Sequence, residues 1–200
     1  MTVRLVPLDC PSCGSALRAE PLDIVFLCDH CGGGAILGDE GLSPLEATAL
    51  LPAPGRRAEL WRPAWVLETH VTVSGRIRAD RRPTPGWEGD RTFVIPAFAL
   101  SIRDLTRLAL ALGRAFGATA EVPREPVTGG ILGLEDAEVL ARHLVVGDEV
   151  RRPDKLATVD VALEVRVRRL AAVPLERTSR GLRCAVTGVT VAGPGGAVTA

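Results

Sequence analysis

The chain lacks several residue types that folded proteins ordinarily use. It contains no tyrosine, asparagine or glutamine, and of its 24 basic residues only one, Lys155, is a lysine. Arginine therefore occupies positions where lysine would be ordinary, and its abundance does not by itself indicate phosphate binding. No uninterrupted apolar run approaches the roughly 18 residues of a membrane span, and Phe93–Leu100, among the longest, contains Pro96. The N-terminus has no basic segment followed by an apolar stretch, so we expect no secretory signal and a cytoplasmic protein.

The 200 residues are 46% hydrophobic and carry no net charge. That composition excludes an intrinsically disordered chain and supports a sizeable core. The charge is nevertheless segregated, because residues 1–53 sum to −5, 54–125 to +4, 126–150 to −4 and 151–200 to +5. Alternating blocks of this kind are typical of surfaces that dock to one another or to a partner. They also arise where solvated faces simply differ in composition.

Four of the five cysteines lie in two short motifs, Cys10-Pro11-Ser12-Cys13-Gly14 and Cys28-Asp29-His30-Cys31-Gly32. Two residues between the cysteines let a tight turn direct both sulfurs at one ion, and the glycine that follows allows the positive φ that such a turn requires. Two such turns supply the four thiolates of a tetrahedral metal site. The intervening residues 15–27 are long enough for a short hairpin with a small apolar cover.

This pattern resembles the zinc ribbon and rubredoxin-like knuckle family over residues 1–38. The resemblance implies a bound metal and a small β fold, and it carries the ligand role over to Cys10, Cys13, Cys28 and Cys31. Across zinc ribbons, the function varies from nucleic-acid contact to protein docking. Two later stretches, residues 93–98 and 185–188, look similar to segments of uncharacterised bacterial zinc-ribbon proteins, and they imply no activity.

The four cysteines leave several chemical alternatives open. We favour a structural Zn²⁺ because so small a module cannot bury enough surface to fold unaided. Rubredoxin-type iron for electron transfer is a second alternative, which the shortage of aromatic residues disfavours, since Phe26 is the only one in the module. Dithiol exchange is disfavoured because no βαβ pattern surrounds either pair, and disulfides because nothing marks the chain as exported. His30 lies between two better ligands, and we expect it to be exposed or to contact a ligand from outside.

Residues 39–57 are expected to connect the ribbon to a larger domain. Ser43 and Glu46 have the spacing of a capping box, and they predict a short helix over residues 42–51. Two prolines and a glycine in residues 52–57 break any regular period and predict a linker.

Residues 58–192 are predicted to form an α+β domain of antiparallel strands with two principal helices. Ser101 and Asp104 form a capping box that opens the first helix, and acidic residues in a first turn favour a second helix over residues 134–145. Residues 193–200 are expected to form a flexible tail. Alternation of apolar and polar residues predicts strands at residues 65–73, 91–100, 159–167, 170–175 and 182–191, with a loop over 78–90.

No catalytic constellation is recognisable in the sequence. Cys184 stands alone on a predicted strand, where a free cysteine usually behaves as a small buried apolar residue. His70 and His143 lie far apart and have no metal- or nucleophile-type spacing, so we expect structural or surface roles for both. The glycine clusters at residues 32–38 and 128–133 match neither G-x-G-x-x-G nor a phosphate loop. An enzyme whose site assembles from distant residues stays open as a third alternative.

We interpret the chain as a non-enzymatic zinc-ribbon adaptor or assembly protein that docks a protein partner. In this hypothesis zinc holds the acidic ribbon in shape, and the ribbon contacts a basic surface on a partner or on its own chain. The alternative is a nucleic-acid-binding accessory protein that uses the arginines in residues 56–82 and 151–183, with Trp61, Trp65 and Trp87 as candidates for stacking on bases. The acidic ribbon disfavours that alternative because phosphate binding needs a positive surface.

Overall fold

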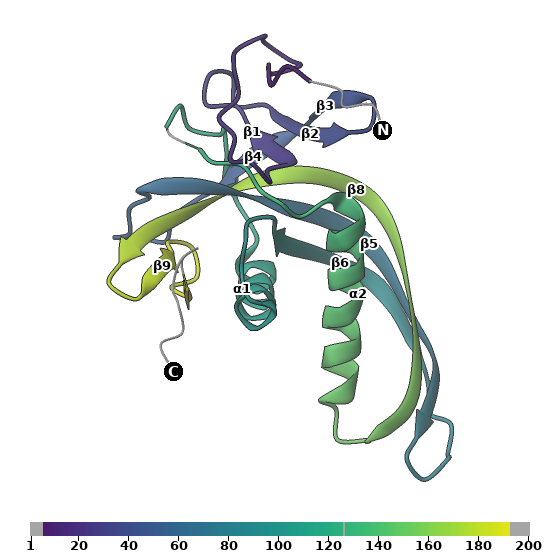
Figure 1. The fold of residues 1–200 in the computed structure, drawn as a ribbon. Coiled ribbons are helices and arrows are strands. Elements are labelled where there is room, and N and C mark those ends of the chain that lie inside the picture. The colour runs from purple at the N-terminus through teal and green to yellow at the C-terminus, as the bar shows by residue number, and fades with distance from the viewer. Residues whose placement is uncertain (1–5, 126, 193–200) are drawn as a thin grey trace.

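A curved sheet of long strands and two helices make up most of the computed structural model (Figure 1). The structure describes residues 6–125 and 127–192, and the expected tail at residues 193–200 lies outside them. The α+β class predicted from the sequence is confirmed. The elements are β1 (Val25–Leu27), β2 (Gly34–Gly38), β3 (Gly41–Leu45), β4 (Ala47–Leu50), β5 (Leu60–Arg78), β6 (Trp87–Pro96), α1 (Ile102–Ala115), β7 (Thr119–Ala120), α2 (Leu134–Val150), β8 (Leu156–Thr178), β9 (Gly181–Cys184) and β10 (Thr190–Val191).

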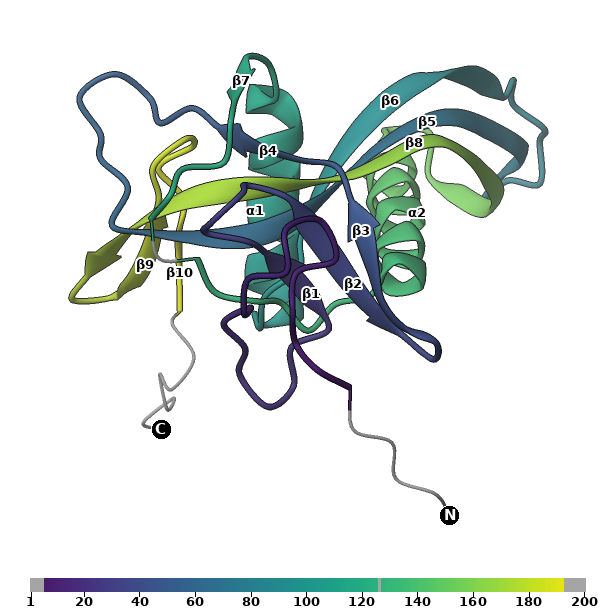
Figure 2. The ribbon, with the colours of Figure 1, turned by 90° about the horizontal axis from the view of Figure 1, so that it is seen from above.

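Strand β8 connects most of the large sheet. It pairs antiparallel with β5 along residues 156–175, and β5 in turn pairs antiparallel with β6. The C-terminal part of β8 also pairs with β4, in parallel, and with β9, antiparallel. Strand β7 pairs with the outer edge of β4, and strand β10 pairs with the outer edge of β9. The long part of the sheet is therefore three strands wide, in the order β6, β5, β8 (Figure 2).

A single strand, β8, replaces the two strands that the sequence predicts at residues 159–167 and 170–175. It continues through the arginines between them because it stays paired with β5 over that whole stretch. The expected loop over residues 78–90 is also shorter, since β5 reaches Arg78 and β6 begins at Trp87. Pairing between distant segments therefore extends strands through stretches whose local sequence is polar.

The short helix predicted over residues 42–51 is wrong. Gly41–Leu45 forms β3, which pairs with β2 and completes a separate three-stranded sheet in the order β1-β2-β3. Pro44 fits in β3 because a strand at the margin of a sheet has N–H groups that need no partner. The next residues, Ala47–Leu50, form β4 beside β8. Pairing with two sheets outweighs the local capping signal. We call residues 6–45, which include this small sheet, the cysteine module.

Both predicted long helices are present, and the second is longer than expected. The Ser101 hydroxyl accepts a hydrogen bond from the Asp104 N–H at 3.1 Å, which confirms the predicted cap of α1. Helix α2 continues to Val150 rather than residue 145, because Val145 and Glu149 extend its buried face. Within the described residues, neither helix is long and apolar enough to cross a membrane.

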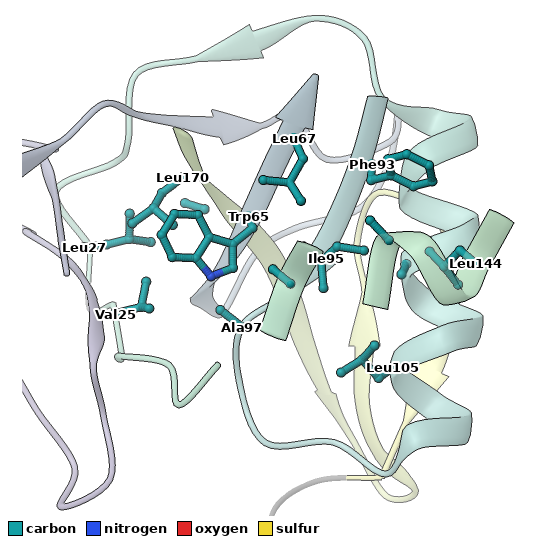
Figure 3. Close-up of a cluster of buried hydrophobic side chains, with 14 of the residues drawn as sticks. Val25, Leu27, Trp65, Leu67, Phe93, Ile95, Ala97, Leu105, Leu144 and Leu170 are labelled. Carbon is teal, nitrogen blue, oxygen red and sulfur yellow. The ribbon is translucent and has the colours of Figure 1, made fainter. Parts of the chain in front are cut away.

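Two apolar clusters lie on opposite faces of β5, because its side chains alternate. The first, which we call the Trp65 cluster, also takes residues from α2 and from β1 of the cysteine module. Figure 3 shows Trp65 beside Val25, Leu27 and Leu170. Helix α1 contributes Leu108 to the second cluster, with Ala64 and Val66 of β5. The alternating face predicted for residues 65–73 is confirmed, and its buried members are Trp65, Leu67, Thr69, Val71 and Val73.

Candidate metal centre

Two turns of the same construction carry the four candidate ligands. In the first, the Gly14 N–H donates to the Cys10 carbonyl at 2.8 Å, and in the second the Gly32 N–H donates to the Cys28 carbonyl at 2.9 Å. Gly14 and Gly32 have φ angles of 75° and 77°, in a region that residues with a Cβ disfavour. The positive φ predicted for both glycines is confirmed.

The two turns bring the four sulfur atoms together. The Sγ atoms of Cys10, Cys13, Cys28 and Cys31 all lie within 4.8 Å of one another. The Cys10–Cys31 and Cys13–Cys28 sulfur pairs are each 3.7 Å apart. A tetrahedral ion with metal–sulfur bonds of about 2.3 Å holds its ligands about 3.8 Å apart. The four cysteines therefore form a donor set whose size fits a tetrahedral metal ion.

Hydrogen bonding and loss of hydration shift the pKa values of Cys13, Cys28 and Cys31 in different directions. Hydrogen bonds with Ser15 lower the pKa of Cys13 to about 6. Loss of hydration raises the pKa of Cys31 to about 12, and it also raises the pKa of Cys28. A cation that binds here must displace the protons that these thiols hold. The Gly33 N–H donates to the Cys31 Sγ at 3.4 Å, and this contact orients the sulfur toward the other three.

Strand β1 joins the cysteine module to the large sheet because its side chains alternate between the two. Phe26 is buried inside the module, in a small cluster with Cys10 and Cys28. Its neighbours Val25 and Leu27, which are 0% and 3% exposed, belong instead to the Trp65 cluster (Figure 3). The module is therefore part of the main core of the protein.

The loop before α2 fixes the module through backbone hydrogen bonds. The Gly130 carbonyl accepts from the N–H groups of Ile24 and Val25 at 2.8 and 2.9 Å, and the Gly130 N–H donates to the Val25 carbonyl at 2.8 Å. The Ala97 carbonyl holds the loop in turn, accepting from the Ile131 N–H at 2.7 Å. A Cβ atom at position 130 would lie only 2.6 Å from the Ala97 oxygen. The close approach of three segments therefore requires glycine here.

We expect Gly130→Ala to lower the free energy of unfolding by about 1–3 kcal/mol, because the added methyl group forces the packed backbone apart. Denaturation in urea measures the change. Gly89→Ala is the matched control, since an added Cβ on β6 at that position meets no atom within 4 Å, and we expect a change within about 0.5 kcal/mol. Equal unfolding midpoints for the two variants would contradict a tight contact at Gly130.

The other residues singled out from the sequence lie away from the sulfur cluster. His30 is exposed and is not one of the clustered ligands. Cys184 is buried in the second apolar cluster, as expected for a free cysteine. His143 is exposed on α2. The structure therefore brings together the four module cysteines and separates them from the remaining candidates.

His70 belongs to a surface cluster that sequence reasoning missed. Its Nδ1 lies 2.7 Å from Asp90 Oδ1, and Arg166 Nη1 lies 3.1 Å from the same oxygen. The hydrogen bond with His70, followed by the charge of Arg166, lowers the pKa of Asp90. A cavity of about 310 Å³ beside them is lined partly by Glu68, which is itself paired with Arg169. Each charged group has a partner of opposite charge, as in an ordinary surface network. Pairing of β6, β5 and β8 assembles the cluster, so no local signal reveals it.

A second missed cluster is buried at the end of α2. Glu149 is fully buried, with Arg76 Nε 2.9 Å from its Oε2, an ion pair without hydrogen-bond geometry. The Trp87 Nε1–H donates to Glu149 Oε1 at 2.8 Å, and Arg76 also contacts Asp154 at 2.7 Å. The network links the end of β5, the start of β6, the end of α2 and the segment before β8. Its charged groups lie in pairs of opposite sign, as in a structural ion-pair network.

Comparison of this chain with protein-family models, curated proteins and solved structures finds no match. The sulfur cluster, together with the apolar contact that holds it on the large sheet, is the strongest functional indication in the described residues.

Proposed function

We propose that this chain is a non-enzymatic adaptor or assembly protein whose cysteine module is a zinc ribbon held in shape by a structural Zn²⁺. The observation that carries the proposal is the cluster of four cysteine sulfurs at tetrahedral spacing. Four thiolates complete the coordination of zinc, so no position is left for a substrate or an activated water. Bound there, zinc supplies cohesion to the module.

The small size of the module's own core supports a structural role for the metal. That core has five buried residues, two of which are the ligand candidates Cys10 and Cys28. So few contacts cannot offset the entropy of ordering about 40 residues. A zinc ion bound by four thiolates contributes folding free energy directly. The remaining support comes from Val25 and Leu27, which pack in the Trp65 cluster.

The proposed docking surface is the outer side of the module, where the sulfur cluster reaches solvent. Cys13 and Cys31 are exposed. Residues 6–45 contain one basic residue, Arg18, against six acidic residues, of which only Asp23 is buried. Four thiolates on a divalent ion add further negative charge. A surface of this sign is complementary to a basic protein surface.

Several contacts favour a protein partner over nucleic acid. Trp65 is fully buried and Trp61 is 7% exposed, so neither ring is free to stack on a base. The Trp87 ring lies 4.5 Å from the Arg91 guanidinium and donates a hydrogen bond to Glu149. Many arginines of the proposed phosphate-binding segments pair with carboxylates of this chain, and these are Arg62, Arg76, Arg78, Arg82, Arg151, Arg152, Arg166, Arg169 and Arg183.

Elemental analysis of the purified chain tests the metal. We expect one zinc ion per chain and a colourless protein, whereas iron with its visible absorption would overturn the choice of zinc. Cys13→Ser is expected to reduce the metal content to near zero. Cys184→Ser is the matched control and is expected to keep the metal, because Cys184 is buried in the second apolar cluster.

Affinity purification from the natural host, with and without nuclease, tests the docking role. We expect a stoichiometric protein partner that survives nuclease and is lost with Cys13→Ser. A partner that stays bound to the metal-free variant would exclude the module as the docking surface. Co-purification that disappears with nuclease would instead favour the nucleic-acid alternative.

A further inference from the structure

One edge of the long sheet, formed by residues 156–169 of β8, has no strand beside it within the described residues. We call this edge the β8 margin. Strand β8 pairs with β5 on one side along residues 156–175. On its other side it pairs only with β4, at residues 170–172, and with β9, at residues 175–178. Residues 156–169 therefore leave their outward N–H and C=O groups without a strand partner along the edge of β8 that faces away from β5 (Figure 2). A margin of this kind is a template for another strand.

The apolar side chains along this margin are only partly covered. Val161, Leu163 and Val165 pack against the Trp65 cluster and stay partly exposed, whereas Val71 on β5 is fully buried. The difference arises because β5 has a strand on each side and this part of β8 has one only. A further strand beside β8 would cover these side chains and pair the free backbone groups together.

The sequence of β8 is self-complementary about Leu163. We propose that a second copy of this chain adds its own β8 antiparallel to this margin, with Leu163 on the two-fold axis. This register places Leu163 opposite its own copy, Val161 opposite Val165, and Asp160 opposite Arg166 of the second chain. By symmetry, each unlike pair occurs twice. The contact is apolar on the inner face of the sheet and complementary in charge on the outer face.

Charge selects this register over the neighbouring ones. An axis at Ala162 would place Asp160 opposite Glu164, and an axis at Glu164 would place two glutamates opposite each other. Like charges directly opposite are destabilising. Asp160 is exposed and forms no ion pair with the described residues of its own chain. The Arg166 side chain is 49% exposed and shares Asp90 with His70. Asp160 is therefore available to a second chain, and Arg166 would exchange its contacts with the exposed Asp90 and Glu164 for one with Asp160 of that chain.

An irregularity in β8 limits how far the added strand extends. Thr69 pairs with Val165 and Glu68 with Val167, so Arg166 is an extra residue that forms a β-bulge. Bulges interrupt pairing and protect a margin from unlimited growth. Because the axis lies at Leu163, the bulges of the two copies fall at equal distances from it, and they end the new pairing symmetrically just beyond the two Asp160–Arg166 pairs. The margin therefore accepts one short strand in a defined register.

Sedimentation equilibrium of the full chain over a range of concentrations tests the proposal. We expect a particle of twice the 21.1 kDa chain mass at micromolar concentration. Asp160→Arg and Arg166→Asp each place like charges opposite each other twice, and each is expected to weaken dimerisation by about tenfold or more. The double variant Asp160→Arg/Arg166→Asp restores both unlike pairs, and we expect it to restore the dimer. A variant with a damaged fold would not be repaired in this way.

Asp39→Arg is the matched control, because Asp39 is exposed in the turn between β2 and β3 and the change in net charge is the same. It is expected to leave the dimer unchanged. Three results would overturn the proposal: a monomer at every concentration, a dimer that Asp160→Arg leaves intact, or a double variant that stays monomeric. A co-purified protein of different mass that protects amides 158–166 from hydrogen exchange would be the partner of this margin. That result too would overturn the proposed dimer.

Discussion

Cys28→Ser is expected to release the metal and to unfold the cysteine module while the long strands stay folded. Cys28 is 1% exposed and contributes to both the sulfur cluster and the small core around Phe26. Structural zinc contributes on the order of 10 kcal/mol in small modules, far more than that core can replace. Hydrogen exchange measures the effect segment by segment. We expect the amides of β1, β2 and β3 to lose their protection and those of the central β5 to keep most of theirs.

Cys184→Ser is the control for this experiment, since it makes the same chemical change at a buried cysteine outside the module. Placing a hydroxyl in the second apolar cluster costs about 1–3 kcal/mol, so the global unfolding midpoint falls. Protection of β1 and β2 and the metal content are expected to stay at their normal values. A Cys28→Ser protein whose β1 amides remain protected would falsify the structural role of the metal.

The parts of this protein that the sequence predicts well are those whose cause is local. Each cysteine turn needs only five consecutive residues, and the turns at Gly14 and Gly32 form as expected. The cap of α1 is equally local, since Ser101 and Asp104 are three residues apart. Alternation along residues 65–73 is a property of one strand, and the structure buries the expected face.

The errors arise where distant pairing decides the local structure. Ser43 and Glu46 do have the spacing of a capping box. The residues before Glu46 nevertheless pair with β2 and those after it pair with β8, so the segment forms two strands instead of a helix. The partner of residues 47–49 in β8 lies more than 120 positions away, and no local pattern encodes that pairing. The entropy cost of closing so long a loop is offset only when the complete sheet forms.

The docking of the module on the large sheet is also outside the reach of local patterns. The charge blocks predict contact between acidic and basic segments, and one such pair, Arg62 with Glu20, lies at the contact at 3.9 Å. The main contact is apolar, through Val25 and Leu27 in the Trp65 cluster. Short apolar strands are common in any small β module. The sequence therefore does not show whether an apolar side chain packs inside its own module or against another sheet.

Arg76→Met is expected to lower the free energy of unfolding by about 3–5 kcal/mol, because it leaves a buried carboxylate without its principal partner. The Arg76 side chain is 6% exposed and lies 2.9 Å from Glu149, whose side chain is 0% exposed. Methionine keeps most of the apolar volume and removes the charge. Trp87 and Arg152 remain as partners of Glu149, and the Arg152 side chain is 43% exposed. Urea denaturation measures the loss.

Arg78→Met is the matched control two residues further along β5. Arg78 pairs with Asp80 at 3.8 Å, and both side chains are 45% exposed, so we expect a loss below about 1 kcal/mol. The double variant Arg76→Met/Glu149→Leu separates the two causes of instability. It removes both charges together, and it is expected to recover most of the stability that Arg76→Met loses, because the cost lies in burying an unpaired charge. If the double variant were less stable than Arg76→Met, Glu149 would stabilise the fold through Trp87 and Arg152 even without Arg76, and an unpaired buried charge would not be the cause of the loss.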